Sequence, residues 1–315
     1  MNTQSDNTPE SAGVSDPGYS SPTSGYNRSS TQPFYWSVRR ELWENRSIYV
    51  APLIVAVVVL FGFLISTIGM PERRQGVLLL DPAHQRAVIG MPYDVAAMML
   101  IVTAFIVGVF YCLDALHSER RDRSILFWKS LPVSDLTTVL SKASIPFVIL
   151  PLIIFGTVVL VQFLMLIWSS AILLPSGLAA TTWTRFNLFQ QSVILLYSLI
   201  VIALWHAPIY GWALVISGWA RRATFLWAVL PFLAIGVLEK IAFDTSHFAS
   251  MLKDRVFGAG DTAFAFQPHR GVAIDSLVQL TPGRYLTTPG LWIGLAFAAA
   301  FVALAVRQRR YRGPI

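Results

Sequence analysis

The sequence predicts an all-α integral membrane protein of about six transmembrane helices, with an N-terminal interfacial helix, a short cytoplasmic helix and short re-entrant helices on the outer side. Two observations predict this class. Hydrophobic residues make up 55% of the chain and charged residues 13%, with a mean hydropathy of +0.58, whereas a soluble domain carries roughly 25% charged residues. The apolar residues also fall in long runs, as bilayer-spanning helices require.

Six runs are long enough to cross the hydrocarbon core, which takes about 20 apolar residues in helical form. Pro146 and Pro151 lie near the start of the third run, Pro208 within the fourth and Pro231 within the fifth. Neighbouring helices in a membrane satisfy the carbonyls that proline leaves free, so we expect kinks at these positions. The runs are residues 48–69, 95–113, 145–168, 192–217, 223–238 and 291–306.

The segments outside these runs hold most of the arginine and lysine behind the net charge of +7. Segments on one side of the predicted bilayer carry 15 of these residues, and the much longer loops on the other side carry 8. The positive-inside rule then places both termini in the cytoplasm, which agrees with an even number of helices, and the chain in the inner (cytoplasmic) membrane. No basic patch is interleaved with a soluble fold, so we expect no nucleic-acid partner.

Residues 1–33 are rich in Ser, Thr, Pro, Gly and Asn and contain no apolar stretch of the kind found in secretory signals. Such a segment buries too little apolar surface to offset its conformational entropy, so we expect a disordered cytoplasmic tail. The transmembrane domain is then expected to cover residues 34–312. Cys112 is the one cysteine, so neither an intrachain disulfide nor a cysteine metal site can form.

Two further segments outside the runs have helical periodicity. In residues 34–46, aromatic and aliphatic side chains lie close to one helical face, with Arg and Glu on the other. We expect this segment to lie in the membrane interface; the alternative is an extension of the first transmembrane helix. The residues that define it are Trp36, Arg40, Glu41 and Trp43.

Residues 242–289 are too long for a simple outer connection. Apolar residues recur there at helical spacing, which predicts short helices that dip into the outer leaflet; a small exposed cap fits nearly as well. These residues are Phe248, Met251 and Leu252, then Ile274, Leu277 and Val278.

Signatures of several enzyme classes are absent. The chain has no G-x-x-x-x-G-K-[ST] phosphate loop, no G-x-S-x-G elbow and no histidine spacing typical of a metal site. We therefore expect no catalytic residue, no metal and no bound cofactor in this chain.

Residues 114–135 connect the second and third runs. A charged turn over 119–123 precedes the apolar stretch Ile125-Leu126-Phe127-Trp128, and Pro132 ends the short helix expected there. Such side chains on a cytoplasmic loop insert into the lipid interface or dock in a groove of a partner protein. The mixed acidic and basic residues favour ion pairs with a protein. Ser134 or Asp135 is expected to cap the next helix.

This loop resembles the first cytoplasmic loop of type-2 ABC exporter permeases, in the Glu119-Arg120-Arg121-Asp122-Arg123 turn and in the Trp128-Lys129-Ser130-Leu131-Pro132-Val133-Ser134 segment that follows. The resemblance extends over most of residues 34–312. In that family the loop is a coupling helix that seats in a cleft of an ATPase subunit. The resemblance therefore implies coupling to a cytoplasmic ABC ATPase through Glu119, Arg120, Arg121, Asp122, Arg123, Phe127, Trp128 and Lys129.

The same resemblance implies two permease copies, as a homodimer or a heterodimer, surrounded by membrane lipids. ATP and magnesium would then be held by the partner ATPase and not by this chain. No charged cluster lines the predicted helices, which favours a hydrophobic or amphipathic cargo.

Four polar residues are candidates for a transport pathway. Gln162 and His206 lie in the third and fourth runs, where a polar side chain most often bonds a neighbouring helix, worth on the order of 1 kcal/mol. Glu239 and Lys240 lie at the outer end of the fifth run, where charge is costly unless paired or wet. They mark a candidate exit vestibule, and an interfacial anchor by Lys240 explains them equally well.

Two other classes of protein remain open. The first is a non-transporting membrane scaffold subunit of a larger assembly. The second, less favoured, is a membrane-embedded lipid-modifying enzyme, for which His117, Glu119 and Asp122 are the only candidate groups at the membrane boundary. Their spacing matches no metal or acid/base pattern.

Overall fold

The computed structural model describes residues 32–130, 133–265 and 276–315. These residues form helices and one isolated β-bridge between Phe264 and Leu280. The prediction of an all-α multi-pass membrane protein agrees with six helical stretches that are long and apolar enough to cross a bilayer. They are Ser47–Ser66, Pro82–Arg121, Asp135–Leu173, Leu188–Trp205, Thr224–Phe243 and Pro289–Tyr311.

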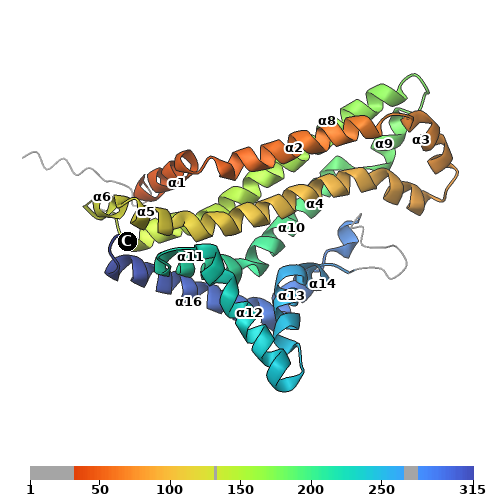
Figure 1. Ribbon diagram of the computed structural model, residues 1–315. Helices are drawn as coiled ribbons and strands as arrows, with labels where there is room; N and C mark the ends of the chain where they lie inside the picture. The colour runs from red at the N-terminus through yellow and green to blue at the C-terminus, as the bar shows by residue number, and fades with distance from the viewer. Residues whose placement is uncertain (1–31, 131–132, 266–275) are drawn as a thin grey trace, which may run out of the picture.

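The N-terminal part of the described chain contains two short helices and two long ones. Helix α1 (Gln32–Glu44) precedes α2 (Ser47–Ser66), and α3 (Met70–Leu78) leads to α4 (Pro82–Ala115). Figure 1 shows α2 and α4 running side by side along the length of the molecule. Residues 1–31 of the expected disordered tail lie outside the described residues, and residues 32–33 belong to α1.

Helix α4 begins well before the predicted start at residue 95. The carboxylate of Asp81 caps it by accepting hydrogen bonds from the backbone N–H groups of Ala83 (3.2 Å) and His84 (3.3 Å), and Pro82 occupies the first helical position. The prediction followed the apolar run and missed these polar first turns. With 34 residues, α4 is about 51 Å long, so it extends beyond a hydrocarbon core of about 30 Å.

The third span is also longer than the predicted 145–168. Helix α7 (Asp135–Ser144) continues through the π-helical turn η1 (Ile145–Ile149) into α8 (Leu150–Leu173). Pro146 and Pro151 lie in and just after this turn. Because neither proline can donate a backbone hydrogen bond, the regular α-helical ladder is interrupted here, and the turn widens to the π form.

Ser134 caps the start of α7, as one of the two sequence candidates. Its Oγ accepts a hydrogen bond from the backbone N–H of Thr137 at 3.1 Å. Replacing Ser134 with alanine is expected to destabilise the protein by about 1 kcal/mol, because a helix N–H loses its partner. Thermal unfolding in detergent measures this loss. Ser130→Ala on the neighbouring helix is the control, and an equal loss in both variants would show that the cap contributes nothing particular.

The prediction of one helix over 192–217 is wrong. The structure has two helices, α10 (Leu188–Trp205) and α11 (Ala207–Trp219), which meet at His206. Pro208 lies in the first turn of α11 and lacks the N–H that would continue the ladder from α10, so the helix breaks instead of kinking. Helix α11 packs closely along α16 (Pro289–Tyr311) and also contacts α4.

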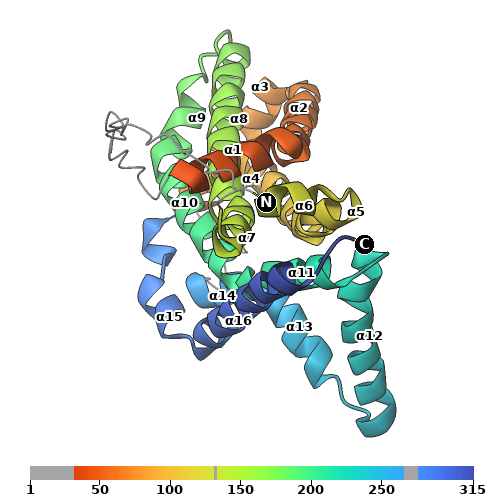
Figure 2. The same cartoon turned by 90° about the vertical axis from the view of Figure 1, so that its left-hand side faces the viewer.

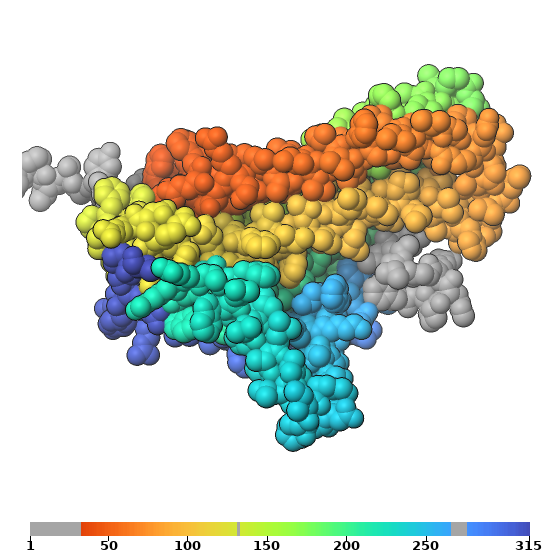
Figure 3. Space-filling view, viewed as in Figure 1, coloured from red at the N-terminus to blue at the C-terminus, as the bar shows by residue number. Residues whose placement is uncertain are grey.

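Helices α12 (Thr224–Phe243) and α13 (His247–Phe257) form an arm that projects from the body of the molecule (Figure 3). Ala228 is the one buried residue of α12. The apolar side chains of this helix are therefore exposed on nearly every side. The fifth span, predicted over 223–238, continues to Phe243, and the sixth, predicted over 291–306, covers Pro289–Tyr311.

The expected outer segment 242–289 contains several short elements. Phe248, Met251 and Leu252 lie in α13, as their spacing predicted, whereas Leu277 and Val278 form a 3₁₀ turn and Ile274 lies outside the described residues. Insertion of this segment into the outer leaflet stays a prediction. Its other elements are α14 (Ala259–Ala263), η2 (Leu277–Gln279) and α15 (Pro282–Thr287).

The core lies where α2, α4, α8 and α11 meet. Tyr93 of α4 is almost fully buried, stacks on Phe186 at 4.2 Å between ring centroids, and lies 3.3 Å from the Ser169 hydroxyl of α8. Phe186 directly follows α9 (Ala180–Arg185), the short helix between α8 and α10. Figure 2 shows α8, α9 and α10 on one side of the molecule and α11, α12 and α16 on the other.

Candidate functional site

Helix ends from distant parts of the sequence meet at one end of the molecule, which we call the charged end. Helix α1, the short helices α5 (His117–Arg121) and α6 (Ser124–Ser130), the start of α7 and the last turns of α16 lie there. Figure 1 shows α1, α5, α6 and the C-terminus together. The predicted charged turn at 119–123 is thus largely a helix, and residues 131–132 lie outside the described residues.

Glu119 lies at the centre of this end and is only 4% exposed. Its Oε1 accepts hydrogen-bonded or ionic contacts from Arg40 Nη2 at 2.9 Å and Lys142 Nζ at 3.2 Å. Its Oε2 pairs with Nη1 of Arg309. One carboxylate of α5 therefore connects α1, α7 and α16.

Glu41 is the second buried carboxylate. Its Oε1 accepts from Lys142 Nζ at 2.8 Å and its Oε2 from the Tyr111 hydroxyl at 2.9 Å. Arg309 also pairs through Nε with Asp135 Oδ1 at 3.2 Å. Three acidic and three basic side chains thus balance one another in what we call the ionic cluster. Its members are Arg40, Glu41, Glu119, Asp135, Lys142 and Arg309.

Glu41 is buried, which differs from its expected place on the polar face of an amphipathic helix over residues 34–46. Glu41 was expected on a polar, solvated face, and it is buried in the ionic cluster. The side chains of Trp36 and Trp43 are exposed, and Arg39 stacks on both of their rings at 5.1 and 4.9 Å. Burial lowers the pKa of Arg40, but the carboxylates of Glu41, Glu44 and Glu119 outweigh this effect and leave the pKa above its usual value.

The predicted coupling residues divide into buried and exposed groups. Glu119 belongs to the ionic cluster, and Arg120 is buried, donating to the carbonyl oxygens of Gly218 (2.7 Å) and Gly313 (3.1 Å). The side chains of Glu119 and Arg120 thus bond to other parts of the same chain. The exposed members of the predicted set are Arg121, Asp122, Arg123, Phe127 and Lys129.

Helix α6 presents an apolar edge to its surroundings. Ile125 is buried and anchors the helix, whereas Leu126 and Phe127 are 59% and 61% exposed. Trp128 is half-buried and lies under the guanidinium of Arg40, with 3.6 Å between the Arg40 Cζ and the ring centroid. The indole of α6 is therefore coupled directly to the ionic cluster.

Helices α5 and α6 also make polar contacts at the charged end. Lys129 Nζ donates to the carbonyl oxygens of Arg310 and Arg312, each at 3.3 Å. Arg121 Nε pairs with Asp122 Oδ1 at 3.0 Å on the surface. Residue Arg123 joins the two helices with a positive φ of 58°.

The four candidate pathway residues do not converge. Gln162 donates through Nε2 to the Tyr93 carbonyl at 3.2 Å, a bond between helices α8 and α4. His206 has Nδ1 2.8 Å from the Ile202 carbonyl oxygen and Nε2 3.0 Å from that of Val256. Both side chains therefore bond to neighbouring backbone, the alternative that the sequence had favoured.

Glu239 and Lys240 serve local structure at the tip of the arm. The Glu239 carboxylate accepts from the backbone N–H groups of His247 (2.7 Å) and Phe248 (2.8 Å), so it caps α13. Lys240 pairs instead with Asp244 at 2.6 Å on the surface. The two residues thus have separate partners.

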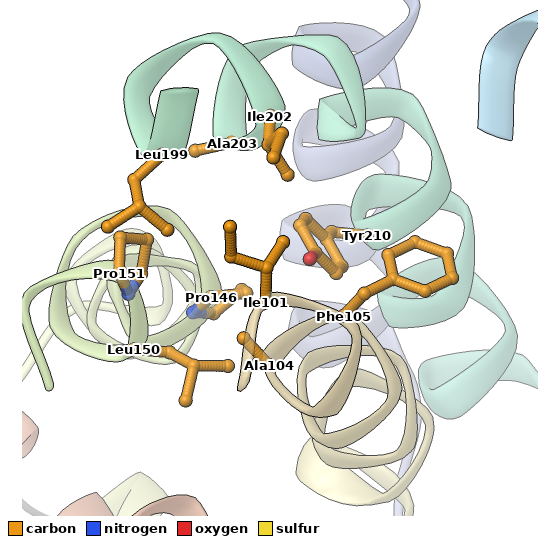
Figure 4. Close-up of a pocket in the computed structure, with 10 residues that line it drawn as sticks. All are labelled: Ile101, Ala104, Phe105, Pro146, Leu150, Pro151, Leu199, Ile202, Ala203 and Tyr210. Carbon is orange, nitrogen blue, oxygen red and sulfur yellow. The ribbon is translucent and has the colours of Figure 1, made fainter. Parts of the chain in front are cut away.

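Two apolar spaces lie near the helix breaks. The smaller, of about 20 Å³, lies between α4, η1, α8, α10 and α11 and has Pro146, Pro151 and Tyr210 in its wall (Figure 4). The larger is an open groove of about 830 Å³ formed by α7, η1, α10, α11 and α16. Every residue that lines the groove is apolar, from Leu136 of α7 to Val306 of α16.

The three residues considered as a catalytic group of a lipid-modifying enzyme each have a different structural partner. The His117 ring has Nδ1 3.2 Å from the Ala220 carbonyl, Glu119 belongs to the ionic cluster and Asp122 pairs with Arg121. Among the residues that the structure describes, no three His, Cys, Asp or Glu side chains are grouped to hold a metal ion.

Comparison with protein-family models, with curated proteins and with solved structures finds no match to this chain. The geometry of the charged end is therefore the basis for a functional proposal.

The sequence patterns did not single out three residues of the charged end, namely Lys142, Arg309 and Tyr111. The signal that could have identified Lys142 is its position in the last turn of a helix that runs directly into an apolar span.

Proposed function

We propose that this chain is the membrane permease subunit of an ATP-binding-cassette transporter, driven by a separate cytoplasmic ATPase that docks on α6. The observation that carries the proposal is the exposed apolar edge of Leu126 and Phe127 on a short helix fixed to the ionic cluster. Exposed apolar side chains flanked by charges are typical of a groove-docking helix. In this arrangement the charged end faces the cytoplasm, as the arginine distribution predicts.

Movement of the ATPase would reach the membrane through specific contacts. A push on α6 acts on Trp128, which stacks on Arg40, and on α5, whose Glu119 holds Lys142 and Arg309. Lys142 and Arg309 lie at the ends of the third and sixth spans. The contacts therefore transmit a displacement to two spanning segments and to α1 as one unit, which suits rigid-body rocking between two states.

The open apolar groove supports a hydrophobic or amphipathic cargo. Its walls include the π turn η1 and Ala207 of the α10–α11 break, where helix geometry is irregular. Irregular helix segments in transporters commonly lie at the pathway for substrate. A second copy of the chain, or another permease, would complete the path.

The docking edge is tested by a double variant, Leu126→Ser with Phe127→Ser. We expect it to lose binding of the ATPase encoded nearest to it, because the apolar surface that enters the groove is removed. The measurements are co-elution in mild detergent, stimulated ATPase rate, and uptake of a hydrophobic dye into vesicles. The expected result is loss of all three in a protein that keeps its melting temperature.

The matched control is Ile68→Ser with Leu79→Ser. Those side chains are 77% and 88% exposed and flank α3 at the opposite end of the molecule (Figure 1). The control is expected to bind the ATPase normally. If the α6 variant binds and activates the ATPase like the parent chain, the docking proposal is wrong.

A scaffold subunit is the second candidate, and the α12–α13 arm favours it. An arm with a single buried residue on α12 presents much apolar surface for other membrane proteins. Copurification of integral membrane partners without any ATPase would support the scaffold and contradict the transporter.

A further inference from the structure

A basic hollow of about 1,230 Å³ lies at the charged end, and Leu126 and Phe127 of α6 are not among its lining residues. It forms where the end of α11, the start of α12 and the end of α16 meet, and Figure 2 shows the C-terminus beside this junction. Four arginines line it, and no lining residue has a carboxylate side chain. The arginines are Arg120, Arg221, Arg222 and Arg312.

The arginines fall into two pairs with different partners. Arg120 and Arg312 donate to backbone carbonyls, Arg312 to that of Trp219 at 2.9 Å, and so are fixed in place. Arg221 and Arg222 are exposed in the turn between α11 and α12, and have no hydrogen bond or ion pair among the described residues. The hollow therefore concentrates the positive charge of four arginine side chains, and the main-chain carboxylate of Ile315 is the one acidic group in its lining.

The start of helix α12 also suits an anionic group. Helix α12 starts directly after this turn, and its N-cap, Ala223 in the left-handed region with φ 51°, provides no side-chain cap. The N–H groups of its first turn are thus available to an anion, and the helix dipole favours one there. Arginine guanidinium groups bind phosphate oxygens in pairs.

Aromatic side chains place the hollow at a membrane surface. Trp219 and Trp227 pack edge to face with 5.0 Å between ring centroids, and Tyr311 lines the same wall. Trp and Tyr are enriched where a helix leaves the hydrocarbon for the headgroup region. Basic pockets between spanning helices at this depth are suited to lipid headgroups.

We propose that this hollow is a binding site for the phosphate headgroup of an anionic phospholipid. Arg221 and Arg222 contact the phosphate, Arg120 and Arg312 supply fixed charge, and the two tryptophans hold the glycerol region. The proposal does not rest on the transport function, because it requires only that these three helices end at a membrane surface. An occupied site would fix the base of the α12–α13 arm against α16.

The test uses the full-length chain in nanodiscs of phosphatidylcholine, with and without phosphatidylglycerol, and native mass spectrometry to count retained phosphatidylglycerol. We expect Arg221→Gln with Arg222→Gln to weaken retention by about tenfold or more, because each arginine near an anionic headgroup contributes about 1 kcal/mol. The control is Arg46→Gln with Arg307→Gln, which removes two exposed arginines outside the hollow. The control should retain phosphatidylglycerol like the parent chain.

Two outcomes would overturn the proposal. One is equal loss of phosphatidylglycerol in both double variants, which would mean general attraction to charge. The other is full displacement of phosphatidylglycerol by millimolar inorganic phosphate, which would assign the hollow to a soluble phosphate compound. Melting temperatures of the variants in phosphatidylcholine alone establish that both remain folded.

Discussion

Replacing Glu119 with alanine is expected to destabilise this protein by about 3–5 kcal/mol. The substitution removes the carboxylate that contacts Arg40, Lys142 and Arg309, and leaves three largely buried cations facing fewer anions. An uncompensated buried charge costs far more than a broken surface pair. The melting temperature of the purified protein in detergent, followed by size-exclusion chromatography after heating, measures the loss.

Asp122→Ala is the matched control for Glu119. It removes an exposed carboxylate from the same loop, paired only with Arg121, and is expected to change stability little. The double variant Glu119→Ala with Lys142→Ala should lose less than the sum of the two single changes, since each removes a charge that the other leaves unpaired. Strict additivity would show that the two side chains do not interact in the folded protein.

Gly211→Leu is expected to cost about 1–3 kcal/mol by forcing α11 and α16 apart. A Cβ at Gly211 would lie 3.1 Å from the Phe301 Cβ and 3.3 Å from the Ala298 carbonyl oxygen. The leucine side chain beyond it has no space between these two backbones. Because α11 begins at the break beside the apolar groove, the same variant is expected to alter the groove and any activity that depends on it.

Gly62→Leu provides the comparison. No atom lies within 4 Å of a Cβ at Gly62 in α2, so leucine enters open space and improves helix propensity by about 0.5–1 kcal/mol. Thermal unfolding of the two variants should therefore move in opposite directions. A Gly211→Leu protein as stable as the parent chain would show that α11 and α16 can separate at little cost.

Hydrophobicity identified the spanning regions because a bilayer imposes a length and a composition on each helix. It did not locate their ends, since Asp81 and Ser134 begin helices with local hydrogen bonds that lie outside the apolar runs. The break at His206 was missed for a related reason. A proline in a membrane helix is compatible with a kink or with a new helix, and only the packing of α11 along α16 decides between them.

The ionic cluster could not be predicted from the sequence patterns because its members come from four separate segments. Glu41 and Arg40 were assigned together to a polar face, whereas packing of α1 against α7 directs Glu41 inward. Phe127 was correctly expected on a surface, while Trp128 is half-covered by Arg40. The exposure of a side chain in such a loop depends on which distant helix packs over it. The spacing of residues within the loop does not show which helix that is.

The order of the cluster along the chain has a consequence for biosynthesis. Ribosomes complete α1, α5 and α7 long before Arg309, the partner that arrives with the last helix. Until then Glu119 and Asp135 lack that cation, and the nascent protein carries an unfinished charged joint. The ionic cluster is therefore complete only when the sixth span is present, and a chain that terminates before Arg309 leaves Glu119 and Asp135 short of one cation.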